Sequence, residues 1–224
     1  MDPDSLRRLA MLAVGLVIAV TVHEFAHARA ALAAGDDTAK RMGRVSLNPI
    51  DHLDLFGTLL FISLIAMNSS FVFGWGKPVP VNPANFKSPR WDSLKVSLWG
   101  PLSNVITACV LTLVLKYLIL PYASMAYIEL AGLCIKFNLV LAVFNLLPIL
   151  PLDGSKIFSS LLPITQARIY ERAVSKYGMF IVFALILIRI PGHGSIISMA
   201  IIPPVDMAFR ALMGFVIGHG PMLT

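Results

Sequence analysis

The sequence predicts an all-α polytopic membrane protein with about five transmembrane helices and a re-entrant or short sixth membrane segment. Two observations point to this fold class. Hydrophobic residues make up 57% of the 224 residues and charged residues only 13%, which leaves too few charged side chains to cover a water-exposed surface. The apolar residues also gather in several runs of about 20 residues, the length that crosses a bilayer as a helix.

This composition excludes several classes of protein. A secreted enzyme, a cytosolic enzyme and a nucleic-acid-binding protein all need a polar surface, so we expect no nucleic-acid partner. The net charge of +6 is typical instead of basic loops that face the cytoplasmic leaflet of a membrane. Cys109 and Cys134 lie singly within apolar runs, and we interpret them as small core residues.

Five apolar runs are the candidate membrane helices. The first three are long and comprise residues 9–34, 94–120 and 125–150. The fourth, 177–191, is short, but residues 173 and 174 can extend it. The fifth, 195–218, contains prolines at 203 and 204, which should kink or break the helix. Lys136 lies inside the third run and therefore needs a partner.

Segment 56–75 is apolar enough to cross the membrane, yet it carries a polar Asn-Ser-Ser at 68–70. It suits a helix, and it equally suits a re-entrant hairpin of two β-friendly arms around a polar turn.

The distribution of basic residues favours the re-entrant interpretation, with the N-terminus outside. If segment 56–75 does not cross, 12 basic residues lie on one face and 4 on the other, whereas a crossing gives 10 and 6. The twelve are Arg29, Lys40, Arg41, Arg44, Lys77, Lys87, Arg90, Lys95, Lys156, Arg168, Arg172 and Lys176, against Arg7, Arg8, Lys116 and Arg189.

A metal-binding pattern lies inside the first predicted helix. Residues 23–27 read His-Glu-Phe-Ala-His, and positions i and i+4 of a helix share one face, so His23 and His27 can bind a single ion. Glu24 then stands beside the ion, where it can take a proton from a metal-bound water. A chance match with two packing histidines is the alternative. Three ionisable groups in one membrane-embedded turn are unfavourable unless paired, however, and a divalent cation is a natural partner.

A zinc hydrolase also needs a third protein ligand and an open fourth position. Position 33, six residues after His27, is alanine, so the third histidine of the extended metalloprotease motif is absent. Among the remaining candidates we single out Asp153, because Pro148, Pro151 and Gly154 beside it can unwind a helix and direct a carboxylate inward. Taken alone, this aspartate also fits a helix cap.

Together these patterns resemble the site-2 protease family of intramembrane zinc metalloproteases, in a compact prokaryotic subgroup without PDZ or CBS domains. The resemblance covers residues 20–160 and rests on five stretches: His-Glu-x-x-His at 23–27, Leu-Asn-Pro-Ile-Asp-His-Leu-Asp at 47–54, Lys-Pro-Val-Pro-Val-Asn-Pro at 77–83, Gly-Pro-x-x-Asn at 100–104 and Asn-x-x-Pro-x-x-Pro-x-Asp-Gly at 145–154. The sequence departs from the family at Ser155, where a second glycine is usual, and at Leu55, where the subgroup often has proline.

The resemblance implies one zinc ion per chain, bound by His23, His27 and Asp153 in a three-helix catalytic core, with Glu24 as the general base. It implies a single membrane-embedded metalloprotease domain over residues 1–224, with the core at about 9–160 and C-terminal helices at about 173–218. The expected substrates are transmembrane proteins cleaved in or near their membrane-spanning segments. The expected location is the prokaryotic inner or plasma membrane, with the active site towards the cytoplasmic side, in agreement with the charge count.

Three further residues are candidates for binding the substrate or the oxyanion. Asn145 and Asn104 lie in apolar runs, where a buried amide needs partners, and a hydrogen bond between helices is the alternative role. His52 could approach the zinc site or bind an ion with a neighbouring aspartate, and it could equally be solvated.

We expect a substrate helix to enter laterally, unwind and add an extended strand to the element at 56–75. Two other functions are compatible with the same residues. One is a metal-ion carrier that uses the intramembrane ligands for transport. The other is a catalytically inactive homologue that only binds membrane partners.

Overall fold

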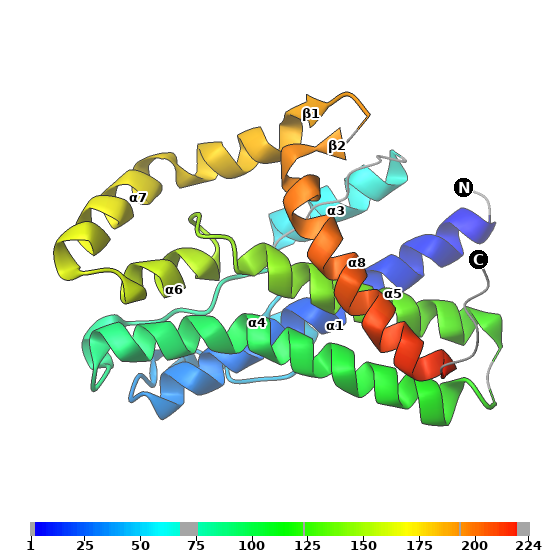
Figure 1. The fold of residues 1–224 in the computed structure, drawn as a ribbon. Coiled ribbons are helices and arrows are strands. Elements are labelled where there is room, and N and C mark those ends of the chain that lie inside the picture. Colours follow the sequence, from blue (N-terminus) through cyan, green and yellow to red (C-terminus); the bar gives the residue numbers. More distant parts are fainter. Residues whose placement is uncertain (1–2, 68–75, 123, 193, 219–224) are drawn as a thin grey trace.

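The computed structural model describes residues 3–67, 76–122, 124–192 and 194–218. It is almost entirely helical, as the sequence predicts (Figure 1). The long helices are α1 (Pro3–Ala33), α4 (Pro89–Val114), α5 (Met125–Asn145), α7 (Ile164–Leu187) and α8 (Ile196–Ile217). The shorter elements are α2 (Thr38–Arg41), η1 (Pro49–Asp51), α3 (Leu55–Ala66), η2 (Pro83–Asn85), the π-helical turn η3 (Leu115–Ile119), α6 (Asp153–Leu161) and the antiparallel strands β1 (Arg189–Ile190) and β2 (Gly194–Ser195).

Four of the described helices are long and apolar enough to cross a membrane, namely α1, α4 with η3, α5 and α8. They correspond to four of the five predicted runs. The remaining run belongs to α7, which has 24 residues but carries charged side chains between Arg168 and Lys176. Its uncharged part is therefore too short to meet the same criteria. Helix α8 continues through both Pro203 and Pro204, so the two prolines do not break the helix.

Helices α1, α4 and α5 pack on one another and form the part of the fold that positions the site. Small side chains line their contacts: Ala19 and Ala28 of α1 and Ala108 of α4 are fully buried. Small residues let helix backbones approach closely within a membrane. Helix α4 begins with Pro89. Proline is tolerated in the first turn of a helix, because a backbone N–H there would have no hydrogen-bond partner within the helix.

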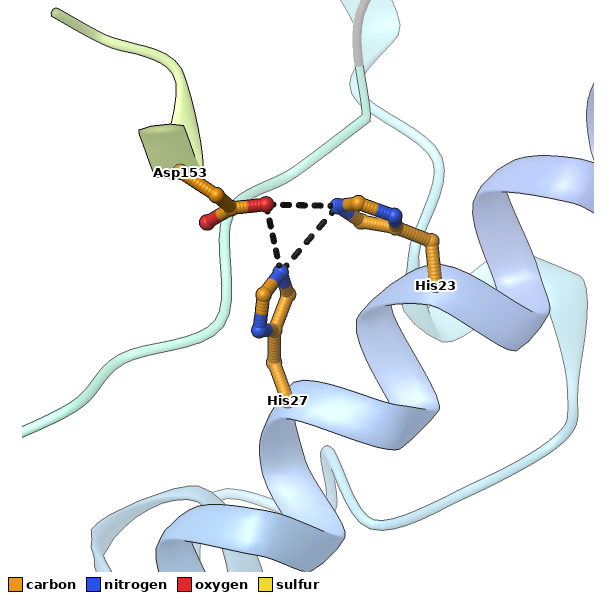
Figure 2. A group of neighbouring side chains, drawn as sticks. All are labelled: His23, His27 and Asp153. Carbon is orange, nitrogen blue, oxygen red and sulfur yellow. Dashed lines mark hydrogen bonds and ion pairs between the residues drawn. The ribbon is translucent and has the colours of Figure 1, made fainter. Parts of the chain in front are cut away.

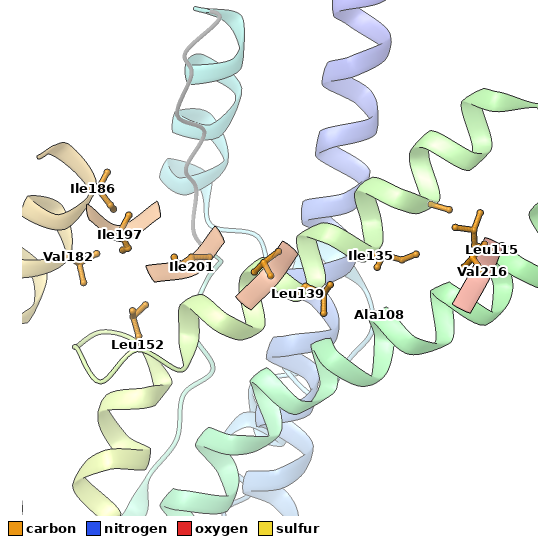
Figure 3. Packing of buried hydrophobic residues seen from close by; sticks show 12 residues of the cluster. Ala108, Leu115, Ile135, Leu139, Leu152, Val182, Ile186, Ile197, Ile201 and Val216 are labelled. Carbon is orange, nitrogen blue, oxygen red and sulfur yellow. The ribbon is translucent and has the colours of Figure 1, made fainter. Parts of the chain in front are cut away.

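A larger apolar cluster joins α5 to the C-terminal helices (Figure 3). Its buried members include Ile135 and Leu139 of α5, Val182 of α7 and Ile201 of α8. Leu152, just before α6, also belongs to the cluster. The loop that leads to α6 is therefore anchored in apolar packing.

Ion pairs tie distant helices together. Lys136 of α5 lies 3.5 Å from Asp206 of α8, which supplies the partner that a lysine inside a membrane run needs. Arg7 of α1 lies 3.6 Å from Glu129 of α5. The first pair joins α5 to α8 at a point that no local sequence pattern indicates.

Segment 56–75 differs from the predicted hairpin of two β-friendly arms. Its first arm is helix α3, and residues 68–75 lie outside the described residues. Leu53 and Gly76 form an antiparallel β-bridge, so the chain leaves and returns at one place. The predicted strand addition cannot take place on α3, because the backbone groups of a helix are hydrogen-bonded within it.

Candidate metal centre

His23, His27 and Asp153, the three predicted ligands, meet at one point (Figure 2). The two histidines lie one turn apart on the same face of α1, as the i and i+4 spacing predicts. Asp153 is the first residue of α6. The Nε2 atoms of the histidines are 3.1 Å apart, and Oδ2 of Asp153 lies 3.1 Å from that of His23 and 3.0 Å from that of His27.

The hydrogen bonding of His27 leaves its Nε2 to face the carboxylate of Asp153. Its Nδ1 lies 2.8 Å from the carbonyl oxygen of Val96, which can only accept, so in the neutral ring the hydrogen is on Nδ1 and the lone pair is on Nε2. This lone pair points at the carboxylate oxygen of Asp153. Two acceptors at 3.0 Å repel each other unless a proton or a metal ion lies between them.

The size and charge of the cluster fit zinc. Neighbouring ligands of tetrahedral zinc, each bound at about 2.0–2.1 Å, are about 3.3 Å apart, so the three ligand atoms need to separate only slightly. Burial opposes ionisation of Asp153, but the imidazoles of His27 and His23 lower the pKa of its carboxyl well below its usual range. Asp153 is therefore a carboxylate at neutral pH, the form that binds a metal ion.

Gly100 of α4 makes room for the two imidazoles. A Cβ atom at this position would lie 2.3 Å from Nε2 of His27 and 2.7 Å from Cε1 of His23. Only a residue without a side chain allows α4 to lie this close to the ligands. The Gly-Pro pair noted in the sequence at 100–101 thus has a steric role at the metal cluster.

Glu24 lines the same cavity as the three ligands, and the cavity has a volume of about 320 Å³. One of its carboxylate oxygens accepts a hydrogen bond of 3.1 Å from the backbone N–H of Val79. Val79 lies between Pro78 and Pro80, and a proline favours extended backbone in the residue before it. Three residues of this stretch, Pro78, Val79 and Val81, form part of the cavity wall.

Asp36 holds the end of that wall in place. Its fully buried carboxylate accepts hydrogen bonds from the backbone N–H of Asn82 at 2.7 Å and from the side-chain amide of Asn85 at 2.8 Å. Two more come from Thr38. Burial raises the pKa of this carboxyl, but the four hydrogen bonds outweigh it and hold the pKa below its ordinary value.

The three further candidates lie in different places. Asn145 lines the cavity, and its amide nitrogen donates to the carbonyl of Leu141 at 3.1 Å. Asn104 is fully buried away from the cavity lining, with its Oδ1 2.7 Å from Nδ1 of His23. His52 is also fully buried, and its Nε2 lies 2.7 Å from the carbonyl oxygen of Ser46 rather than at the metal cluster.

Several groups around the site are not indicated by the sequence patterns. The carbonyl of Val96 and the N–H of Val79 are backbone groups, which leave no trace in residue type. Asn138, which contacts Asn104, can be recognised from the sequence, because it is an amide in an apolar run and such a group needs buried partners. Asp36 carried a weaker signal as an acidic residue directly after the metal-binding helix.

Comparisons with known proteins identify the family. The family described as Peptidase family M50 matches residues 120–189. The chain is 43% identical over 183 residues to the Bacillus subtilis (strain 168) protein named "Putative zinc metalloprotease YwhC", a match that covers 79% of this chain and 80% of that protein. It is 38% identical over 71 residues to the Synechocystis sp. (strain ATCC 27184 / PCC 6803 / Kazusa) protein named "Putative zinc metalloprotease sll0528", covering 32% of this chain and 18% of that protein.

No solved structure matches the chain significantly. The match to the Bacillus subtilis protein nevertheless extends over most of both chains, far more than the length of α1. The family match falls in a different part of the chain from that helix and indicates the same family. The protein therefore belongs to peptidase family M50, the site-2 protease family.

Proposed function

We propose that the protein is an intramembrane zinc metalloprotease that hydrolyses peptide bonds in or near the transmembrane segments of other membrane proteins. The observation that carries this proposal is the convergence of His23, His27 and Asp153 in a cavity that Glu24 also lines. Family membership supports it. We assign one zinc ion per chain to the three converging side chains and the role of general base to Glu24.

Zinc, when bound, supplies a Lewis acid that lowers the pKa of water and polarises a substrate carbonyl. Glu24 takes a proton from the attacking water and then gives it to the nitrogen of the leaving amine. The N–H of Val79 occupies one carboxylate oxygen of Glu24 and leaves the other for this proton. We assign to Asn145 a hydrogen bond from its amide to the oxygen of the substrate carbonyl or to the substrate backbone.

The same proposal includes the topology of a single membrane-embedded domain. We propose that α1, α4 and α5 form the catalytic core, that α7 and α8 complete five transmembrane helices, and that segment 56–75 is re-entrant. The β-bridge between Leu53 and Gly76 supports the last point, because the two ends of the segment are on the same side. The count of basic residues supports an active site towards the cytoplasmic side of a prokaryotic cell membrane.

The substrate needs an extended backbone to reach Glu24, so a transmembrane helix has to unwind on entry. The stretch at 77–81 contributes Pro78, Val79 and Val81 to the cavity wall, and its prolines favour extended backbone in the residues before them. We therefore move the expected strand addition from segment 56–75 to this stretch.

The test compares wild-type protein with Glu24→Gln, which keeps the shape of the side chain but removes the base. Each protein is purified in detergent, its zinc content is measured by elemental mass spectrometry, and cleavage is measured on a single-span membrane protein reconstituted with it in vesicles. We expect about one zinc per chain in both proteins and a loss of cleavage of at least about 100-fold in Glu24→Gln. Glu129→Gln, which alters an exposed glutamate of α5, is the control and should cleave normally.

Each rival function gives a different result. A metal-ion carrier would move zinc into vesicles. An inactive homologue would bind zinc but would not cleave the single-span membrane protein. Cleavage that survives in Glu24→Gln would overturn the assignment of the base, and a wild-type chain that does not bind added zinc would overturn the metal site. A carrier would need acidic residues available along several spans, but Glu129 of α5 and Asp206 of α8 are paired with Arg7 and Lys136.

A further inference from the structure

A series of buried amide hydrogen bonds connects His23 with α5. Asn104 of α4 and Asn138 of α5 are both fully buried. Asn104 Oδ1 lies 2.7 Å from Nδ1 of His23, and its Nδ2 donates to Asn138 Oδ1 and to the carbonyl of Ala19, each at 2.9 Å. Asn138 Nδ2 donates in turn to the carbonyl of Cys134 at 2.9 Å. The series begins at a metal-ligand candidate and ends at a backbone carbonyl.

The two carbonyls fix the direction of every hydrogen bond in this series. A carbonyl oxygen only accepts, so the amide nitrogen of Asn138 faces Cys134 and its oxygen faces Asn104. Asn104 then uses both amide hydrogens on Asn138 and Ala19. Its oxygen is left for His23, whose Nδ1 must donate. The lone pair of His23 is therefore on Nε2, the atom that lies in the metal cluster.

The reversed arrangement is unfavourable at every step. If the amide of Asn104 were turned round, its oxygen would face two other acceptors, and two buried hydrogen bonds would be lost. His23 would then accept on Nδ1 and carry its hydrogen on Nε2, where it blocks coordination. His27 reaches the competent form without such help, because the carbonyl of Val96 accepts directly from its Nδ1.

We propose that Asn104 and Asn138 form a polarity relay that sets the tautomer of His23, so that its Nε2 is free to bind the metal ion. The proposal rests on the proposed zinc site, and it makes both asparagines positioning residues that act through His23. Neither residue lines the cavity. An amide suits both points, since it accepts a hydrogen bond at its oxygen and donates at its nitrogen.

The experiment uses the full chain in detergent as wild type, Asn104→Leu and Asn138→Leu. The control is Thr112→Val, which removes a buried hydroxyl of α4 that bonds only within its own helix, at Ala108. Two quantities are measured for each protein. The tautomer of His23 is read from the ¹⁵N chemical shifts of labelled imidazoles in metal-free protein, and the Kd for zinc is measured by competition with a chelator.

We expect the hydrogen on Nδ1 of His23 in the wild type and in Thr112→Val, with equal Kd values. In Asn104→Leu the tautomer with the hydrogen on Nε2 should appear, and the Kd should rise about 10–100-fold. Asn138→Leu should change both quantities in the same direction but less, because Ala19 still holds Asn104. Asn104→Asp keeps an acceptor beside His23 and should restore the wild-type tautomer.

The inference is overturned if both leucine variants keep the wild-type tautomer and zinc affinity. It is also overturned if Thr112→Val weakens zinc binding as much as Asn104→Leu does, because the effect would then be a general loss of packing. A wild-type chain that binds no zinc, but whose His23 changes tautomer in the leucine variants, refutes the proposed function and leaves the relay intact.

Discussion

Replacing Gly100 with alanine measures how closely α4 approaches the metal ligands. The new Cβ would lie 2.3 Å from Nε2 of His27, whereas atoms in contact are about 3.5 Å apart, so the imidazole has to retreat by about 1.2 Å. Metal–ligand distances tolerate only about 0.2 Å. The retreat also strains the 2.8 Å hydrogen bond between His27 and Val96. We expect Gly100→Ala to bind zinc at least about 100-fold more weakly, as is usual for a misplacement of this size.

The assay is zinc competition in detergent, with thermal unfolding measured on the same samples. Gly132→Ala in α5 is the matched control, because a Cβ there meets no atom within 4 Å. Alanine in place of an interior helical glycine stabilises by about 0.5–1 kcal/mol where space is free, so the control should gain stability and keep zinc. If Gly100→Ala behaves like this control, α4 does not lie against the ligands and the reasoning is refuted.

Three other experiments test the supports of the site. Asp36→Asn places an NH₂ against the N–H of Asn82 and should destabilise by about 1–3 kcal/mol in chemical unfolding. The folded-state pKa of Asp36 is lowered, so its contribution is complete above the unfolded value of about 3.9 and is lost as the pH falls through the lower folded value. Unfolding midpoints of wild type should therefore fall on acidification more than those of Asp36→Asn. Gly154→Ala puts a Cβ 2.3 Å from the carbonyl oxygen of residue 146 and should lose zinc, and normal zinc content would contradict this. A double-mutant cycle with Lys136→Met and Asp206→Asn should give a coupling of about 1 kcal/mol, and additivity would show that the ion pair does not hold α8.

Much of the helical framework follows from the sequence, because apolar run length sets where a membrane helix is stable. The predicted run 125–150 becomes a helix that ends at Asn145, since Pro148 and Pro151 follow, and α6 starts anew at Asp153. That separate short helix was not predicted. Its nine residues are half polar, so run length gives no sign of them.

Some features of the site depend on local sequence spacing, and others depend on how the helices pack. The spacing of His23 and His27 is a property of one helix and can be recognised in any chain. The relation of His23 to Asn104 depends on the packing of α1 against α4, which spacing along the chain does not encode. The partner of Lys136 was out of reach for the same reason, because Asp206 lies 70 residues later on another helix.

The bridge between Leu53 and Gly76 makes the stretch near Glu24 independent of the segment between these two residues. Since its ends are already joined, the stretch between them is a closed loop, and doubling the length of such a loop changes the free energy of closure by only about 0.6 kcal/mol. Residues 54–75 can thus be lengthened, shortened or exchanged while Val79 still meets Glu24. The candidate metal site and the segment that precedes Gly76 are therefore free to vary independently, and chimaeras exchanged between Leu53 and Gly76 should keep the contact of Val79 with Glu24.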